Sequence, residues 1–238
     1  MPHTFSTLWP DDFPSRLREI PQTPKKLYIE GTVPNWEHKF LCVVGARAYT
    51  PYGKSVTEKI VGGLRGYPII IVSGLALGID AVAHKAALDS GLTTVAVPGS
   101  GLSPQVLYPS SNRELAKKIV SSGGALVSEF EHEFRATSWA FPQRNRIMAG
   151  LSHAVLVIEA EAKSGTLITS RLATDYNRDV LTVPGSILSK NSEGPHLLIK
   201  LGATPITSAD DVLAALGFEK TAQVNSRDKY KDCGVDEL

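Results

Sequence analysis

The sequence has no excess of charge of either sign. Its 238 residues carry 25 lysines and arginines against 24 aspartates and glutamates, which gives a formal net charge of +1. Such a balance provides no overall electrostatic attraction to nucleic acid, so any basic binding surface must be local. Tight nonspecific binding to duplex DNA is therefore not expected.

Cysteines and long apolar segments are also scarce. Cys42 lies in an apolar run and Cys233 in a polar tail, and their spacing fits neither a metal site nor a disulfide framework. The sequence contains no run of 18 apolar residues and no signal-like segment at its start. We therefore expect a cytoplasmic protein with no membrane association, no metal and no cofactor.

What the sequence does contain is a regular alternation of apolar strands and helical patterns. Continuous apolar runs such as KFLCVV at residues 39–44 are typical of strands that are buried on both faces of a parallel sheet. The alternation predicts an α/β fold, a doubly wound and mostly parallel sheet with helices on both faces. Strands are expected at residues 39–44, 69–73, 93–98, 125–128, 154–159 and 180–183, and helices at residues 53–65, 78–90, 110–121, 144–151 and 165–176; a last helix, strand and helix are expected within residues 193–216.

Two flanking segments differ in composition from this main domain, which we place at residues 39–217. Residues 1–38 are rich in proline and show one short helical pattern, at residues 13–20, so we expect an arm that lies over the main domain. Residues 218–238 are polar with scattered charges and little apolar content, which predicts a C-terminal tail.

One turn has the composition of an anion site. The strand expected at 154–159 is followed by Lys163, by Ser164, Gly165 and Thr166, and then by a helix. A turn of this kind directs backbone N–H groups and a helix N-terminus at one point, which suits a phosphate group. We expect the turn to contact a phosphate backbone.

Other candidates lie after the first two strands of the main domain, where doubly wound sheets bind their ligands. Arg47 stands where a dinucleotide fingerprint needs its second glycine, and the distance from Gly45 to Gly53 is too long for a Walker loop. Arg47 instead offers a forked cation for phosphate oxygens, unless it pairs with a neighbouring carboxylate. After the second strand, Gly74 permits a tight turn and Ser73 can donate to a ligand.

Two further pairs leave alternatives open. Asp80 and His84 are four residues apart on one predicted helix face, and they form either an acid–base pair or, as we favour, a structural pair at the helix start. Tyr108 precedes Pro109, so its ring either stacks on a base or packs as a wedge, the commoner role.

The densest cluster precedes the strand at 154–159. Phe141 is followed by Arg144, Asn145 and Arg146 at a predicted helix start. Aromatic surface beside guanidinium groups is typical of single-stranded nucleic-acid sites, because bases stack while phosphates pair with arginine. The alternative is a core phenylalanine with structural arginines; together with Arg47 and the 164–166 turn, the binding interpretation is favoured. Two glutamates, Glu159 and Glu161, are expected to orient these cations or to accept from backbone donors.

Several motifs in this order resemble the DNA-processing protein A family (DprA, also called Smf) over residues 12–216. The segments that carry the resemblance are GAR at 45–47, SGLALGID at 73–80, VPGSG at 97–101, YPSSN at 108–112, SEF at 128–130, FPQRNRIMAGLS at 141–152, VIEAEAKSGTLIT at 157–169, VPGSI at 183–187 and LIKLGA at 198–203.

The resemblance implies an extended Rossmann-like domain that binds single-stranded DNA without base specificity, forms a homodimer and helps to load a RecA-type recombinase in natural transformation. It implies no catalytic activity. In the family, an arginine after the first strand and a glycine–hydroxyl loop line the DNA pocket and an aromatic residue stacks on a base; these roles fall on Arg47, residues 164–166 and Phe141. Candidate dimer contacts are the apolar residues around Leu198 and at 212–216, although burial within the domain explains them equally well.

The sequence departs from the family pattern in three places. Ser138 and Trp139 stand where the family often carries a lysine, and residues 194–196 read GPH where it has a Gly-Thr-Asn turn. The chain is also expected to lack the N-terminal helical and C-terminal winged-helix domains that many members carry.

An enzyme of similar fold is the main alternative. Nucleoside-monophosphate phosphoribohydrolases share the arginine helix, strand and glycine-rich loop, but they need a pair of glutamates directly after that loop to stabilise an oxocarbenium-like centre. Here Leu167, Ile168 and Thr169 follow the loop. A binding protein is therefore favoured over an enzyme.

Overall fold

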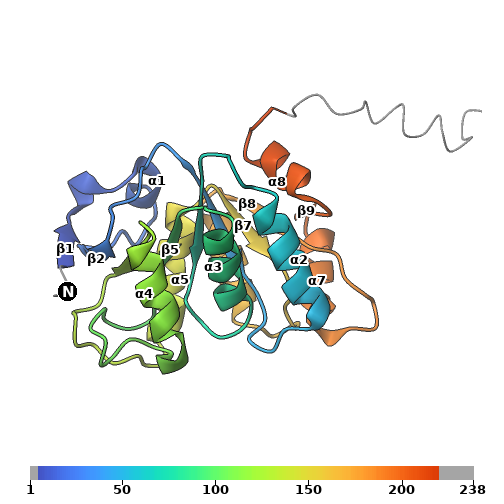
Figure 1. Cartoon of the computed structure of the whole chain (residues 1–238). Coiled ribbons are helices and arrows are strands. Elements are labelled where there is room, and N and C mark those ends of the chain that lie inside the picture. Colours follow the sequence, from blue (N-terminus) through green and yellow to red (C-terminus); the bar gives the residue numbers. More distant parts are fainter. Residues whose placement is uncertain (1–4, 220–238) are drawn as a thin grey trace, which may run out of the picture.

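The computed structural model describes residues 5–219, which form a nine-stranded sheet with the order β1-β2-β6-β5-β4-β3-β7-β8-β9 (Figure 1). Only β1–β2 and β2–β6 are antiparallel pairs, and the other neighbours are parallel. The strands are β1 Phe5–Leu8, β2 Leu27–Gly31, β3 Lys39–Val44, β4 Ile69–Ser73, β5 Thr94–Ala96, β6 Ala125–Ser128, β7 Ala154–Val157, β8 Asp179–Thr182 and β9 Thr204–Pro205.

Helices cover both faces of this sheet, as the sequence predicts for a doubly wound fold (Figure 1). The α-helices are α1 Ser15–Arg18, α2 Pro51–Gly62, α3 Ile79–Asp89, α4 Arg113–Ser121, α5 Ala140–Leu151, α6 Thr166–Asp175, α7 Glu193–Lys200 and α8 Ala209–Ala215, and short 3-10 helices occupy Pro10–Asp12, Ser110–Asn112 and Lys190–Ser192. Within residues 5–219, no helix has both the length and the apolar character needed to cross a membrane.

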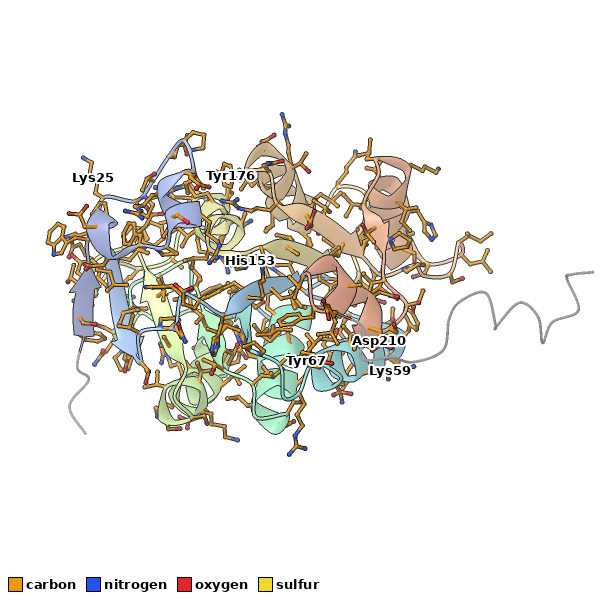
Figure 2. All side chains as sticks on the ribbon, turned by 90° about the horizontal axis from the view of Figure 1, so that it is seen from above. Lys25, Lys59, Tyr67, His153, Tyr176 and Asp210 are labelled. Carbon is orange, nitrogen blue, oxygen red and sulfur yellow. The ribbon has the colours of Figure 1, made fainter. Side chains whose placement is uncertain are left out.

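The central strand β3 divides the core into two halves. Phe40 and Cys42 point to the face covered by α1, α5, α6 and α7, whereas Leu41 and Val43 point to the face covered by α2, α3 and α8. This follows from the two-residue period of a strand. Apolar side chains fill both layers (Figure 2), which is why the continuous apolar runs predicted the inner strands correctly.

The strand order also fixes where a ligand can bind. From β3 the chain builds the sheet first toward β4, β5 and β6, and later, on the other side, toward β7, β8 and β9. A crevice forms at the carboxyl ends of strands where the order reverses in this way. The loops after β3, β4 and β7 therefore meet at one place.

Two local predictions were wrong. Residues 5–31 do more than lie over the domain, because β1 and β2 extend the sheet beyond β6. In addition, α5 begins at Ala140 and not at residue 144, so Phe141 and Pro142 belong to its first turn. Proline is tolerated there because the N–H groups of a first turn make no hydrogen bond within the helix. Residues 220–238, most of the predicted tail, lie outside the described part of the chain.

Candidate functional site

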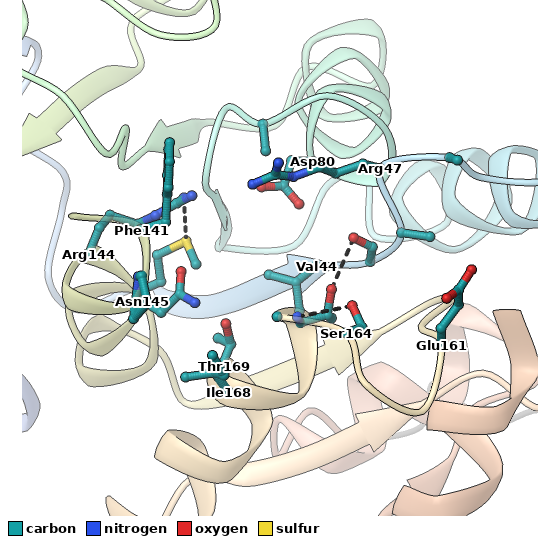
Figure 3. Close-up of a pocket in the computed structure, with 18 of the residues that line it drawn as sticks. Val44, Arg47, Asp80, Phe141, Arg144, Asn145, Glu161, Ser164, Ile168 and Thr169 are labelled. Atoms are coloured by element: carbon teal, nitrogen blue, oxygen red, sulfur yellow. Dashed lines mark hydrogen bonds between the residues drawn. The ribbon is translucent and has the colours of Figure 1, made fainter. Parts of the chain in front are cut away.

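A cleft of about 370 Å³ opens at the crevice beside the carboxyl ends of β3 and β7 (Figure 3). Its walls come from the segment after β3, the loop after β4 with the start of α3, the first three turns of α5, the loop that leads into α6 with the first turn of that helix, and the 3-10 helix at residues 190–192. The lining residues are Val44, Gly45, Ala46, Arg47, Ala48, Ala76, Asp80, Phe141, Pro142, Arg144, Asn145, Met148, Glu161, Ser164, Gly165, Thr166, Ile168, Thr169 and Asn191. The fold thus brings together most of the residues that the sequence singles out.

Arg47 and Phe141 form one side of the cleft. The Arg47 guanidinium carbon lies 5.6 Å from the centre of the Phe141 ring, within the range of a cation–π contact. Among residues 5–219, no carboxylate lies within ion-pair distance of Arg47. No described carboxylate therefore neutralises Arg47, and the charge of this exposed side chain is available to a ligand.

Arg144 is the most unusual group in the cleft, because its side chain is buried without an ion pair among the described residues. The residue is only 5% exposed, and its Nη1 donates to Met148 Sδ at 3.2 Å while its Nε has no hydrogen-bond partner. Burial lowers the pKa of Arg144, and the nearby Asp80 carboxylate opposes this shift. Burying a cation with unused hydrogen-bond donors costs free energy unless an anion or other acceptors bind to those donors.

Gly74 makes room for this arginine. A Cβ atom at position 74 would collide with the Arg144 guanidinium, so only glycine permits the group to occupy its place. The Gly74 N–H is itself engaged, because it donates to Asp80 Oδ2 at 3.1 Å. Gly74 therefore supports the cleft from behind, and we find no free donor on it for a ligand.

Asp80 lines the cleft and His84 does not; both are buried, and they do not form an acid–base device in the cleft. Burial raises the pKa of Asp80, with Arg144 acting in the opposite direction. His84 does not line the cleft; its Nδ1 lies 2.7 Å from Thr94 Oγ1, and burial together with Arg144 lowers its pKa to about 3. Each residue has structural contacts of its own, and among the described residues no hydrogen bond links Asp80 to His84, so the predicted pairing is not observed.

The 164–166 turn lies in the cleft with fewer free donors than predicted. The Ser164 N–H donates to Glu161 O at 3.0 Å and the Thr166 N–H donates to Ser164 Oγ at 3.2 Å, so only the Gly165 N–H lacks a described partner in this turn. The Thr166 hydroxyl donates to Gly45 O at 3.1 Å and ties the turn to the end of β3 (Figure 3).

Besides Gly74, three predicted site residues lie outside the cleft. The Ser73 hydroxyl is fully buried and donates to Val43 O at 2.7 Å, so it cannot donate to a ligand. Arg146 points away from the cleft, where it pairs with Glu129 and donates to the backbone carbonyl of residue 22. Lys163 is exposed beside the turn and does not line the cleft.

The two glutamates after β7 have different surroundings. Glu159 is buried and accepts from both the backbone N–H and the hydroxyl of Thr50, at 2.9 and 2.5 Å, as its predicted pairing with backbone donors requires. Glu161 is exposed at the cleft rim. Asn191 also lines the cleft and donates to Ala48 O at 2.9 Å, although no sequence pattern identified it.

Asn145 completes the cleft wall formed by α5. Its side chain is 9% exposed and turns toward the cleft in Figure 3, with no side-chain hydrogen bond to a described residue. Its amide therefore adds a neutral donor next to the two arginines. Within residues 5–219, no group of three or more histidine, cysteine, aspartate or glutamate side chains is arranged to hold a metal ion.

Comparisons with known proteins agree with these features. Residues 4–217 match the family described as DNA recombination-mediator protein A. Protein Smf of Escherichia coli is 41% identical over 87% of this chain, and the chain spans 54% of the length of that protein. The DNA processing protein DprA of Streptococcus pneumoniae is 42% identical over 87% of this chain, which spans 72% of that protein.

Solved structures give the same relationship. The crystal structure of the S. pneumoniae DprA superposes with a TM-score of 0.83 at 41% identity, covering 91% of this chain and 75% of that one. A structure of DNA processing protein A from Helicobacter pylori, described for its single-stranded DNA binding mode, gives a TM-score of 0.80 at 29% identity, covering 90% of this chain and 96% of that one.

Proposed function

We propose that the cleft of this chain, which belongs to the DNA recombination-mediator protein A family, binds single-stranded DNA without base preference. The observation that carries the proposal is Arg144, a buried guanidinium that faces the cleft with unused hydrogen-bonding capacity and no ion pair among the described residues. A phosphate group supplies both the negative charge and the acceptors that such a cation lacks.

The remaining cleft groups suit the other parts of a nucleotide strand. Arg47 is an exposed second cation, and the Asn145 amide is a neutral donor. Phe141 offers ring surface to a base, and stacking of this kind tolerates any base because every base has a π-face. None of these groups reads the hydrogen-bonding edge of a base, so binding without base preference is expected.

Arg47 and Phe141 cannot act independently in this arrangement. The guanidinium covers the ring in the free protein, so a base that stacks on that face must displace Arg47. The displaced cation stays close enough to meet the phosphate of the same strand. The two substitutions should therefore be non-additive, as expected for residues in contact.

The positions of the carboxylates in the cleft favour a binding function over hydrolysis. Asp80 and Glu161 are the carboxylates among its lining residues; Asp80 is held by the Gly74 N–H, and Glu161 lies at the rim. The segment after Thr166 contributes Ile168 and Thr169 to the lining and no carboxylate. A phosphoribohydrolase needs acidic groups at that point, so we propose a binding protein that is not an enzyme.

A homodimer forms part of the proposal, through a surface other than the one expected. Leu198 and the apolar residues at 212–216 are largely buried in the domain core. The neighbouring Leu197 of α7 and Leu201, just after the end of that helix, are exposed by 43% and 75%, and Ile187 and Leu188 by about 90% each. We propose these exposed apolar side chains as the association surface.

Transfer of the bound strand to a RecA-type recombinase is the last part of the proposal, and it rests on the family description as a recombination mediator. A direct measurement is recombinase assembly on single-stranded DNA coated with a single-strand binding protein, with and without this chain. Faster assembly in its presence supports transfer, and an unchanged rate contradicts it.

Fluorescence anisotropy tests the cleft directly. Binding of labelled single-stranded DNA, duplex DNA and nucleoside monophosphates is measured at two salt concentrations, together with any release of free base. Arg47→Ala should weaken single-strand binding uniformly across sequences and reduce the salt slope by about one. Phe141→Ala should cost about 1–3 kcal/mol of binding free energy.

Arg65→Ala is the matched control, because Arg65 is exposed just before β4, at the opposite end of the sheet. It should leave binding unchanged. Release of base from a monophosphate, or a loss confined to particular sequences in Arg47→Ala, contradicts the proposal.

A further inference from the structure

A second, smaller hollow adjoins the cleft on the far side of Phe141. The two share Arg47, Ala76, Phe141 and Arg144 in their linings, so they form one continuous surface. The hollow adds side chains from the loops after β4 and β5, among them Leu77 and Tyr108. At about 20 Å³ it is too small to enclose a base, so a ligand at this place must lie over its rim.

Tyr108 dominates that rim. Its ring centre lies 5.7 Å from that of Phe141, with 50° between the ring planes, and the residue is 47% exposed. The Tyr108 hydroxyl has no hydrogen bond to a described residue, and no cation of residues 5–219 lies over its ring. Packing as a wedge therefore does not account for the exposed part of this side chain.

The Phe141 ring is the more enclosed of the two. Arg47 lies over it, and the backbone at Gly99 approaches so closely that a Cβ atom there would be 2.6 Å from Phe141 Cδ1. Tyr108 thus presents the open aromatic surface next to a ring that is partly covered. A strand that leaves the cleft past Phe141 meets Tyr108 next.

The backbone around Tyr108 is fixed relative to the cleft. Its N–H donates to the buried Ser100 Oγ at 3.2 Å, and Asn112 Nδ2 donates to Leu75 O and Ala76 O at 2.9 and 3.1 Å. The first bond lies within the loop after β5, and the two Asn112 bonds join the end of that segment to the loop after β4. Because the backbone that carries the ring is fixed, only the side-chain torsions of Tyr108 remain to be ordered when a base stacks on the ring.

From this geometry we propose that Tyr108 is a second base-stacking position, which takes the nucleotide next to the one at Phe141. The inference rests on the proposed function, because it extends the same single-stranded DNA site by one subsite. The ring separation is compatible with neighbouring nucleotides, whose rise is about 3.4 Å when stacked and larger when the bases are splayed apart. Leu77, which is 50% exposed on the same rim, provides apolar contact at its edge.

The test uses the full chain and an oligothymidylate of about six nucleotides, within the site sizes of such proteins. Tyr108→Ala and Tyr108→Leu should raise the dissociation constant by about 5- to 150-fold, the loss of one stacked base. Tyr108→Phe keeps the ring and should bind as the unsubstituted chain does. Trp9→Ala is the control, because Trp9 is 57% exposed just after β1, at the outer edge of the sheet.

Photo-crosslinking supplies a readout that a structural role does not produce. An oligonucleotide containing 5-iododeoxyuridine should crosslink to the peptide that contains Tyr108, as identified by mass spectrometry. Thermal melting of each variant shows whether it folds; if Tyr108→Ala does not fold, Tyr108→Leu and the crosslink decide the question.

The outcomes separate the inference from the proposed function. If the unsubstituted chain binds and Arg47→Ala weakens binding, while the Tyr108 variants bind normally and no crosslink forms at Tyr108, the second position is overturned and the cleft stands. An equal loss in Trp9→Ala overturns it too, because the effect is then general. If the unsubstituted chain binds no single-stranded DNA, both proposals fail.

Discussion

His84 should make the fold sensitive to acid. Its Nδ1 lies 2.7 Å from Thr94 Oγ1, and that hydroxyl donates onward to Ile71 O at 2.9 Å. The hydroxyl proton is thus already used, so Nδ1 carries the proton and donates to Thr94, which leaves Nε2 as a buried nitrogen without a hydrogen-bond partner. Burial and then the nearby Arg144 lower the pKa of His84, and the Ser73 backbone only partly offsets them.

The direction and size of the effect follow from linkage. The pKa of His84 is about 3 in the folded chain, against 6.5 for an ordinary histidine. Because the folded value is the lower one, the unfolded chain takes up the proton first as the pH falls. Stability is therefore full above about pH 6.5 and is lost progressively between that pH and about 3. At pH 5 the loss from this one side chain is about 2 kcal/mol.

Urea denaturation at pH 7 and pH 5 measures this loss in the unsubstituted chain and in His84→Asn, whose amide can still donate to Thr94 but does not titrate. The difference in unfolding free energy between the two pH values should be about 2 kcal/mol larger in the unsubstituted chain. His153, whose pKa burial lowers to about 4, is present in both proteins and cancels in the comparison. Equal pH dependence in the two proteins, or an NMR titration of His84 near pH 6.5, refutes the reasoning.

Two further substitutions test the support of the cleft. Gly78→Ala should destabilise the fold by at least about 1–3 kcal/mol, because Gly78 has φ +88° and an added Cβ would strike the Arg47 backbone; an unchanged melting temperature contradicts this. Arg146→Met leaves the largely buried Glu129 unpaired and should cost about 3–5 kcal/mol in denaturation experiments. The folded Arg146→Met protein should keep its affinity for single-stranded DNA. Weaker binding would show that Arg146 belongs to the binding site.

Helix α5 marks the limit of what the sequence predicts about the site. Its arginines are two residues apart, and positions at that spacing do not share a helix face. Periodicity therefore indicates that Arg144 and Arg146 diverge, but it does not say which of them faces the cleft. That depends on the position of Glu129, in a loop beyond β6, which attracts Arg146 to the other side.

The fold was easier to predict where strands are buried on both faces, because such strands are continuously apolar in sequence. The inner strands β3 and β4 are continuous apolar runs, and their predicted bounds agree with the structure. The strands β1 and β2 were missed because four and five residues among prolines show no distinctive alternation. The pairing of β2 with β6 is fixed by contacts with residues about 100 positions away, such as Tyr28 with Ser128, and β1 then pairs with β2; local sequence does not encode the β2–β6 contacts.

The surroundings of Arg144 could not be predicted from local sequence either, because they come from segments far apart in the chain. Gly74 leaves space for the guanidinium, Asp80 is held beside it by the Gly74 N–H, and α5 delivers the arginine from about 70 residues further along the chain. The side chain is thus fixed before any ligand arrives, whereas the exposed Arg47 must still be ordered. Because fixing a long side chain costs about 0.5–1.5 kcal/mol on binding, a phosphate at Arg144 avoids a cost that it meets at Arg47. Arg144 should therefore hold the strand in register, and Arg47 should mainly set the salt dependence.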